Sequence, residues 1–171
     1  RGNKIPVLLN VGMLSETKGV LILLESAHIL INKGYLFQLQ LMGRFESSAF
    51  QKKSDDYIVQ HKLQDFISFL GVQTGDKKYQ TFARADIFCF PTFFEAETFG
   101  LVALEAMQFG LPVVATKWRG VPSVVHHNRS GFVVPPRDAS AFAEKLEILL
   151  NEPNLRMEMG KAGRAIYDEK F

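Results

Sequence analysis

The sequence predicts an α/β fold: a doubly wound, mostly parallel sheet with helices on both faces. Short apolar runs alternate along the chain with longer amphipathic stretches, which is the pattern of strands joined by helical crossovers. The short runs are apolar on both faces, as in strands that are covered on both sides. The chain has 171 residues, 47% of them hydrophobic, which suffices for one sizeable core. We therefore expect a single domain over residues 1–171.

Six strands and six helices are expected in order. The strands are the apolar runs at residues 6–12, 65–71, 85–91, 111–116 and 130–134, together with the run at residues 36–43, which alternates between apolar and polar residues. The helices are the amphipathic stretches at residues 18–33, 47–62, 76–84, 138–150 and 154–167, together with a helix that opens at Gly100. Gly34 ends the first helix, and Asp138 or Ser140 caps the helix at residues 138–150.

Such sheets bind ligands at the carboxyl ends of their strands. The loops at that edge follow Gly12, Gly43, Leu70, Pro91 and Thr116, and they hold most of the unusual residues of the chain. A ligand site is therefore expected along this edge of the sheet.

Composition excludes several classes of protein. A net charge of +2 is too small to indicate nucleic-acid binding. Cys89 is the single cysteine, which rules out an internal disulfide and favours a reducing, cytoplasmic compartment. Its apolar neighbours indicate a buried small hydrophobe. No uninterrupted apolar run is long enough to span a membrane, and the start lacks the features of a signal peptide.

The common cofactor and nucleotide motifs are absent. The chain has no G-x-G-x-x-G, no G-x-x-x-x-G-K-[ST] and no G-x-S-x-G. It has no D-x-D that would suggest a metal-bridged diphosphate, and His126 and His127 have no partner at metal-ligand spacing. We expect neither a cofactor nor a metal.

Two glutamates flank the start of the helix at Gly100. Helix N-termini carry unpartnered N–H groups and partial positive charge, which suits phosphate. Glu97 stands on one side of this turn, and Glu105 lies roughly 7–8 Å further along the axis. A nucleotide-sugar presents the matching order of sugar hydroxyls, diphosphate and ribose diol, and Lys18 can offset the repulsion between carboxylates and phosphate. The alternative is that Glu105 pairs with a buried Arg or Lys while Glu97 is a solvated loop residue.

The pair Glu97-x7-Glu105 resembles the E-x7-E signature of retaining glycosyltransferases with the GT-B fold. Four blocks of the chain, in the right order, resemble the carboxyl-terminal, donor-binding half of the glycogen-synthase-like and sucrose-synthase-like family, a Rossmann-like domain. These blocks are VGMLSETKG (residues 11–19), ISFLGVQTGDK (67–77), CFPTFFEAETFGLVALEAMQFGLPVVAT (89–116) and RGVPSVVHHNRSGFVVPPRDASAFAEKL (119–146).

The resemblance implies a role for each motif residue. Glu97 would contact the hydroxyls of the transferred hexose, and Lys18 would pair with the donor diphosphate; these two are the expected catalytic residues. Glu105 would hold the ribose hydroxyls. The remaining donor-binding positions would be loop and helix-mouth residues: Gly12, Met13, Gly71, Val72, Phe99, Gly100 and Leu101. The donor would be a UDP-, GDP- or ADP-sugar, bound without a metal.

The chain departs from the family pattern at several positions. Met13 stands where the family has an arginine, so one of two diphosphate cations is missing, and Arg44 or Arg119 could replace it. Glu95 precedes the motif and is a rival of Glu97 for the sugar. Ser123 replaces the glutamate of the family's G-G-x-P-E.

The resemblance covers only the donor half of such enzymes. We expect the amino-terminal acceptor domain to lie outside these residues, so this part alone would bind donor but transfer little. A saccharide or lipid-linked acceptor, and any peripheral contact with the inner face of a membrane, would involve the other half. Two other functions remain open: a non-catalytic nucleotide or nucleotide-sugar binding module, which Met13 favours, and a flavodoxin-like signalling domain, which the lack of clustered aspartates disfavours.

Overall fold

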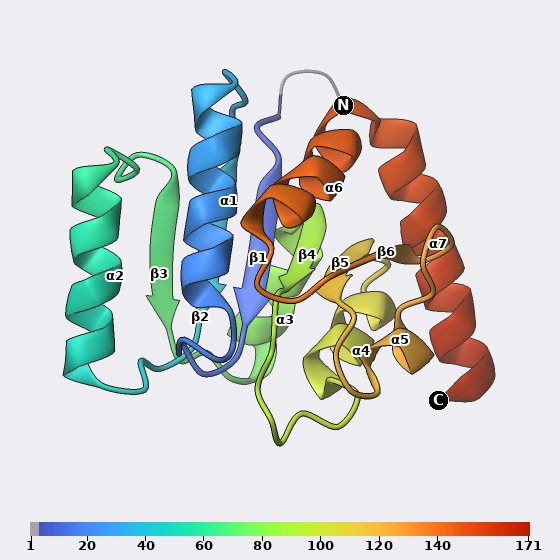
Figure 1. Cartoon of the computed structure of the whole chain (residues 1–171). Coiled ribbons are helices and arrows are strands. Elements are labelled where there is room, and N and C mark those ends of the chain that lie inside the picture. Colours follow the sequence, from blue (N-terminus) through green and yellow to red (C-terminus); the bar gives the residue numbers. More distant parts are fainter. Residues whose placement is uncertain (1–3) are drawn as a thin grey trace.

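The computed structural model describes residues 4–171, which form a six-stranded parallel sheet between two layers of helices (Figure 1). The strands are β1 (Val7–Val11), β2 (Gln38–Met42), β3 (Ile67–Gly71), β4 (Ile87–Phe90), β5 (Val113–Thr116) and β6 (Gly131–Val134). The helices are α1 (Val20–Asn32), α2 (Ser48–Gln60), α3 (Gly75–Arg84), α4 (Leu101–Gln108), α5 (Val121–Val124), α6 (Ala139–Asn151) and α7 (Pro153–Lys170).

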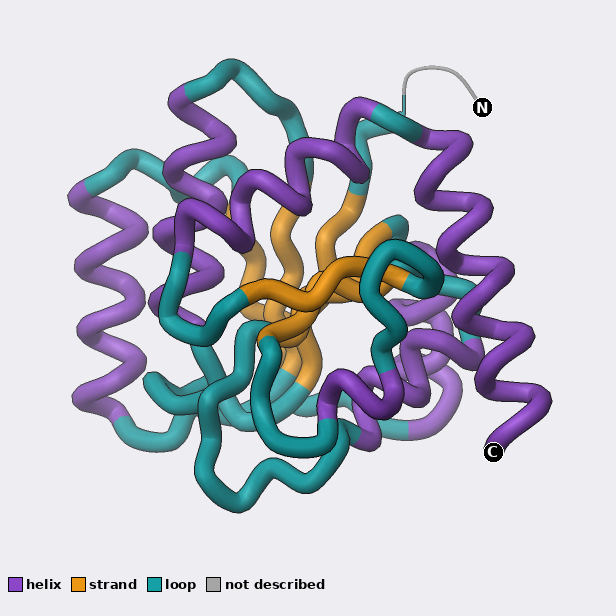
Figure 2. Tube along the Cα trace, turned by 45° about the vertical axis from the view of Figure 1, so that its right-hand side comes forward, coloured by secondary structure: helices purple, strands orange, loops and turns teal. Residues whose placement is uncertain are grey.

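The strand order is β3-β2-β1-β4-β5-β6, with every pair parallel. After β1, the chain adds β2 and then β3 on one side of it. Helix α3 then leads back to the other side of β1, where β4, β5 and β6 follow in order. The order therefore reverses between β1 and β4, where the loops that follow these two strands diverge. Figure 2 shows loops gathered at this end of the strands.

Two apolar layers hold the sheet. One packs the side chains of α1, α2 and α6, such as Leu23, Ile58 and Phe142, against one face. The other packs α3, α4 and α5 against the opposite face, with Phe82 and Phe88 among its buried rings. Because both faces are covered, β4 and β5 are buried along their whole length, as expected for strands that are apolar on both sides. Strand β2 instead alternates, and its two glutamines are only partly buried.

The carboxyl-terminal helix α7 packs beside β6, the outermost strand on that side of the sheet. It contributes buried side chains to both apolar layers, and α4 is its main helical neighbour. A Cβ atom at Gly160 would collide with the carbonyl oxygen of Gly110, so glycine permits this close approach. Within residues 4–171, no helix combines the length and the apolar character needed to cross a membrane.

The predicted fold class is confirmed, and the expected elements are all present. Each lies within three residues of its expected bounds. Asp138, rather than Ser140, caps α6, since its side chain accepts a hydrogen bond from the backbone N–H of Ala141 at 2.9 Å. The short helix α5 was missed, because four residues are too few to show a helical period.

Cys89 lies in the middle of β4 and is fully buried. Burial in this apolar setting raises the pKa of its thiol, so the side chain remains neutral. Its backbone carbonyl accepts a hydrogen bond from the amide of Asn10 on β1 at 3.0 Å. Cys89 therefore acts as a small core residue, as expected.

Candidate functional site

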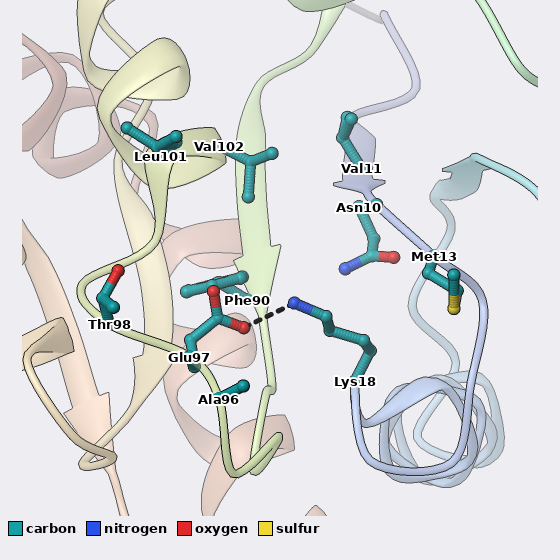
Figure 3. Close-up of a pocket in the computed structure, with 11 residues that line it drawn as sticks. Asn10, Val11, Met13, Lys18, Phe90, Ala96, Glu97, Thr98, Leu101 and Val102 are labelled. Atoms are coloured by element: carbon teal, nitrogen blue, oxygen red, sulfur yellow. Dashed lines mark hydrogen bonds and ion pairs between the residues drawn. The ribbon is translucent and has the colours of Figure 1, made fainter.

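The carboxylate of Glu97 lies at the switch point, between the loops that follow β1 and β4. The Lys18 ammonium donates a hydrogen bond to Glu97 Oε2 at 2.6 Å (Figure 3). The Thr92 hydroxyl donates to the same oxygen at 3.0 Å. Only 11% of the Glu97 side chain is exposed. Glu97 is therefore no solvated loop residue, and the two predicted catalytic side chains face each other.

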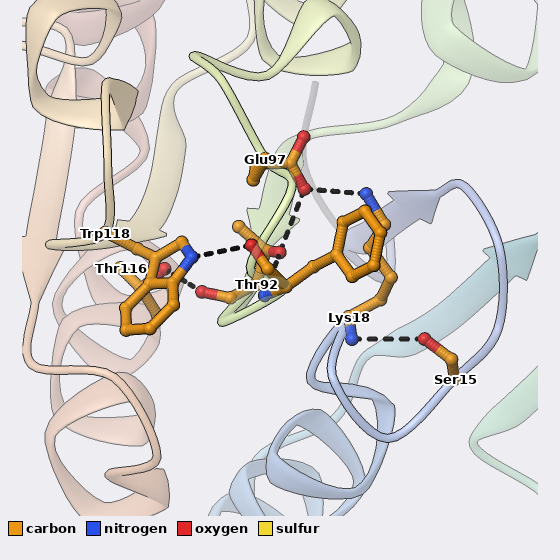
Figure 4. A network of polar contacts seen from close by, with 7 residues as sticks. Ser15, Lys18, Thr92, Glu97, Thr116 and Trp118 are labelled. Atoms are coloured by element: carbon orange, nitrogen blue, oxygen red, sulfur yellow. Dashed lines mark hydrogen bonds and ion pairs between the residues drawn. The ribbon is translucent and has the colours of Figure 1, made fainter.

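Thr116, the last residue of β5, and Trp118 hold the loop that carries Glu97 in place (Figure 4). The Thr116 hydroxyl donates to the carbonyl oxygen of Thr92, and the Trp118 indole N–H donates to that of Phe94 at 2.8 Å. The backbone N–H of Phe94 in turn donates to the Thr92 hydroxyl at 3.2 Å. These contacts fix the backbone around Thr92 and Phe94, and with it the position of Glu97.

The mouth of α4 opens beside Glu97. Gly100 precedes the helix with φ 84°, and a Cβ atom there would lie 2.5 Å from the Phe90 ring. The Thr98 carbonyl oxygen accepts a hydrogen bond from the N–H of Gly120 at 2.7 Å, which fixes the loop just before the turn. Glycine is thus required at the helix start, and the first N–H groups of α4, from Leu101 on, carry the partial positive charge of a helix N-terminus.

Glu105 lies one turn further into α4 and pairs with Lys78 of α3, whose Nζ is 2.8 Å from Glu105 Oε2. The side chains are 32% and 26% exposed respectively, so the pair is accessible to solvent. The alternative that Glu105 pairs with a buried Arg or Lys is therefore met only in part. Glu105 does pair with a lysine, but both side chains are partly exposed. Glu105 is therefore not enclosed by the fold.

A groove of three hollows follows the carboxyl edge of the sheet. The hollow at the α4 mouth has a volume of about 190 Å³, less than the roughly 300 Å³ of a small ligand site, so a larger ligand would extend beyond it. The second hollow shares Val11, Gly12 and Met13 with the first, and the third shares Gly43, Arg44 and Val72 with the second. The residues that line the first hollow are Asn10, Val11, Gly12, Met13, Lys18, Phe90, Ala96, Glu97, Thr98, Leu101 and Val102.

Most of the expected donor-binding residues meet in this groove. Gly12, Met13 and Lys18 line it from the first loop, and Glu97 and Leu101 from the loop before α4 and its first residue. At the far end are the base-side residues Gly71 and Val72. Phe99, Gly100 and Glu105 line none of the three hollows. Phe99 and Gly100 precede Leu101 at the helix mouth, and Glu105 is connected to the second hollow by its ion pair with Lys78.

Three polar residues of the site were missed from the sequence. Thr92 follows β4 directly and binds Glu97, and Asn10 is a buried amide within an otherwise apolar strand. Lys78 lies in the first turn of α3, two residues after Asp76. Only Asn10 carried a signal in the sequence, because a polar side chain inside an apolar run needs a partner.

A model of the glycosyl transferases group 1 family matches residues 2–166. The chain belongs to this family. It is similar to the capsular polysaccharide biosynthesis glycosyltransferase CapM of Staphylococcus aureus, with 32% identity over 94% of this chain and 41% of CapM. A sulfoquinovosyl transferase of Arabidopsis thaliana is 40% identical over 56% of this chain and 19% of that protein. The chain thus spans only part of these group 1 relatives.

Solved structures agree on the fold. HepE of Anabaena in complex with UDP-glucose matches with a TM-score of 0.89 and 25% identity, over 98% of this chain and 45% of HepE. The carboxyl-terminal domain of LpcC, a glycosyl transferase group 1 family protein of Francisella tularensis, matches with a TM-score of 0.85 and 26% identity, over 97% of this chain and 87% of that domain. The resemblance to the GT-B glycosyltransferases is confirmed.

The positions at which this group 1 chain departs from the family pattern have distinct surroundings. Glu95 is exposed and lines none of the three hollows, whereas Glu97 lines the first. Arg44 lines the second hollow, together with Met13, and also the third. Arg119 instead lies over the Trp118 ring, 5.3 Å from its centroid. Of the two candidate arginines, Arg44 is therefore the one in the groove.

Proposed function

We propose that this chain binds a nucleotide-diphosphate sugar and forms the donor-binding domain of a retaining, metal-independent glycosyltransferase. One observation carries the proposal: Glu97, the mouth of α4 and the Glu105–Lys78 pair follow one another along α4, with Glu97 and Leu101 lining the first hollow and Lys78 lining the second. Membership of the group 1 family supports it, as does the similarity to HepE, a protein whose structure has been solved in complex with UDP-glucose.

The order of groups in the donor assigns the roles. The transferred sugar, a hexose, lies at Glu97, whose carboxylate accepts hydrogen bonds from the sugar hydroxyls. The diphosphate lies at the α4 mouth, where the N–H groups of Phe99, Gly100 and Leu101 and the ammonium of Lys18 meet it. The ribose diol lies at Glu105, and the base reaches Gly71 and Val72.

The chemistry consists of positioning and charge stabilisation. When the bond between the sugar and the diphosphate breaks, negative charge grows on the leaving phosphate, and Lys18 and the helix mouth stabilise it. For this, the Lys18 ammonium must leave its ion pair with Glu97 and bind phosphate instead. The Glu97 carboxylate is then free to bind the sugar. Retention follows if the acceptor attacks from the face that the leaving group vacates, with no protein nucleophile. The acceptor, a saccharide or a lipid-linked sugar, binds in the other half of the protein.

Calorimetric titration tests the donor site. The chain is titrated with UDP, GDP and ADP and then with their glucose conjugates, first without metal and then with Mg²⁺. We expect one nucleoside diphosphate to bind without metal, and Glu105→Ala to weaken that binding about tenfold, the loss of one charge-assisted hydrogen-bonding group.

Glu97 and Glu95 form a matched pair of variants for the sugar. Glu97→Gln is expected to weaken the glucose conjugate more than the free diphosphate, whereas Glu95→Gln changes neither. If Glu95→Gln weakened the binding of the glucose conjugate as much as is expected for Glu97→Gln, the sugar contact would be assigned to Glu95. Binding only with Mg²⁺ would contradict a metal-independent site.

The second candidate is a non-catalytic module that senses the same nucleotide. Met13 favours it, because an exposed thioether stands where a diphosphate cation is expected. The two functions differ in turnover: a sensor binds the nucleotide-sugar but neither transfers nor hydrolyses it in the whole protein. Severe loss of turnover in Lys18→Ala and Glu97→Ala whole protein would establish the enzyme instead.

A further inference from the structure

A second lysine–glutamate pair, between Lys78 and Glu105, reaches the groove through its lysine. Lys18 meets Glu97 at 2.6 Å beside the α4 mouth, and Lys78 meets Glu105 at 2.8 Å one turn further along α4. Both lysines line the groove, Lys18 in the first hollow and Lys78 in the second, and both hollows include Met13. Each glutamate of the signature thus has a lysine from a different segment of the chain.

We propose that Lys78 binds the α-phosphate of the donor and so supplies the second diphosphate cation in place of the arginine that Met13 replaces. The inference rests on the proposed function. A nucleotide-sugar has the covalent order sugar, β-phosphate, α-phosphate, ribose. Lys18 and Glu97 then face the junction of the sugar with the β-phosphate, and Lys78 and Glu105 face the junction of the α-phosphate with the ribose.

The stability of helix α3 does not explain why a lysine stands at position 78. It is the fourth residue of α3, in a first turn that also holds Asp76. The N-terminus of a helix has partial positive charge, so a lysine there is repelled and an acid is preferred. An incoming phosphate would compensate this repulsion, because it brings two or more negative oxygens to the same place. Until then the cation is held by Glu105 alone among the described residues within ion-pair distance.

Two neighbouring cations are less suited to the α-phosphate. Arg44 lines the second hollow as Lys78 does, but it also lines the third, with Gly71 and Val72 at the base end of the groove, whereas Lys78 does not. Lys77 is exposed on the same helical turn and lines none of the three hollows. Lys77 has the same charge and nearly the same distance to the helix start, which makes it the matched control.

The test compares the binding of ligands that carry two, one and no phosphates. Wild-type chain and the variants Lys78→Gln, Lys77→Gln and Lys18→Gln are titrated with the nucleoside diphosphate that binds, its monophosphate and its nucleoside. We expect Lys78→Gln to weaken the diphosphate and the monophosphate by a similar factor of about ten or more, and the nucleoside by much less. Lys18→Gln weakens the diphosphate only. Lys78→Arg restores binding, and Lys77→Gln matches wild type.

The outcomes separate the two proposals. If the wild-type chain binds no nucleotide, the proposed function fails for this chain and the role of Lys78 fails with it. If the wild type binds and Lys78→Gln binds equally well or more tightly, only the role of Lys78 is overturned, because Lys78 then merely occupies Glu105 in competition with the ribose. Thermal unfolding of each variant shows whether a loss of binding reflects a loss of fold.

Discussion

At the scale of single residues, the polar contacts of Glu97 leave one oxygen for a ligand. Lys18 and Thr92 both donate to Oε2, and none of the hydrogen bonds among the described residues uses Oε1. The Thr92 hydroxyl accepts a hydrogen bond from the N–H of Phe94, so its own proton is directed to Glu97. A hydroxyl has one proton to give, and here the carboxylate receives it. Thr92 thereby sets the orientation of Glu97.

Replacing Thr92 tests this orientation. Thr92→Val keeps the shape but leaves the N–H of Phe94 without its acceptor, and we expect a loss of about 1–3 kcal/mol in the free energy of unfolding. Thr92→Ser keeps the hydroxyl and should lose only the contacts of one methyl group, about 0.8 kcal/mol. Urea unfolding measures both, and equal losses would show that the hydroxyl contributes nothing. In the titrations above, only Thr92→Val should weaken the glucose conjugate.

At the scale of elements, the alternation of strands and helices could be read from the sequence because it is local. Each strand is an apolar run between turn residues, and each long helix has its own amphipathic period. The loops around Glu97 could be placed at the carboxyl edge for the same reason. Partners from distant segments could not be predicted: Lys78 meets Glu105, and Trp118 meets Phe94, only because α3 packs beside α4 and the end of β5 beside that of β4.

The start of α4 depends on Gly100. Gly100→Ala and Gly34→Ala both place a Cβ at positive φ, which costs about 1–2 kcal/mol each. Gly34 has open space around that position, whereas Gly100 has the Phe90 ring at 2.5 Å. We expect Gly100→Ala to lose about 1–3 kcal/mol more than Gly34→Ala in urea unfolding. It should also weaken diphosphate binding, since the helix mouth must shift. Equal losses would mean that the ring moves aside freely.

The contact between α1 and α2 predicts a dependence on pH. The His28 and His61 rings lie 4.3 Å apart between their centroids. Burial, and then the charge of His61, lower the pKa of His28 below its usual 6.5. The unfolded chain therefore takes up this proton first, so the free energy of unfolding falls as the pH drops below about 6.5, and no such loss occurs above it.

Unfolding by urea between pH 5 and 8 measures this effect. His28→Gln should flatten the decline on the acidic side, because it removes the group whose protonation the fold opposes. His126→Gln removes a histidine that follows α5, a helix that packs on the opposite face of the sheet from α1 and α2. If both variants flatten the profile equally, the effect does not come from that contact.

At the scale of the whole molecule, the groove lies along an open edge of the sheet. Large apolar side chains around it are exposed, including Met13, Val72 and Leu101. The chain spans less than half the length of CapM and of HepE, so in such proteins most residues lie outside the part that matches.

Because we propose that this chain is the donor-binding part of a longer protein, binding and transfer should separate when the chain is compared with that whole protein. The residues to which we assign donor contacts all lie within residues 10–105, so we expect the chain to bind the nucleoside diphosphate within about tenfold of the whole protein's affinity. Turnover should be at least about a hundredfold lower, because the acceptor is no longer held beside the sugar and water is not excluded. Release of nucleoside diphosphate from the nucleotide-sugar, with and without a saccharide acceptor, measures this. Equal turnover would place the acceptor site within these 171 residues, whereas loss of binding together with turnover would contradict the donor-binding role proposed for this chain and, with it, the role of Lys78.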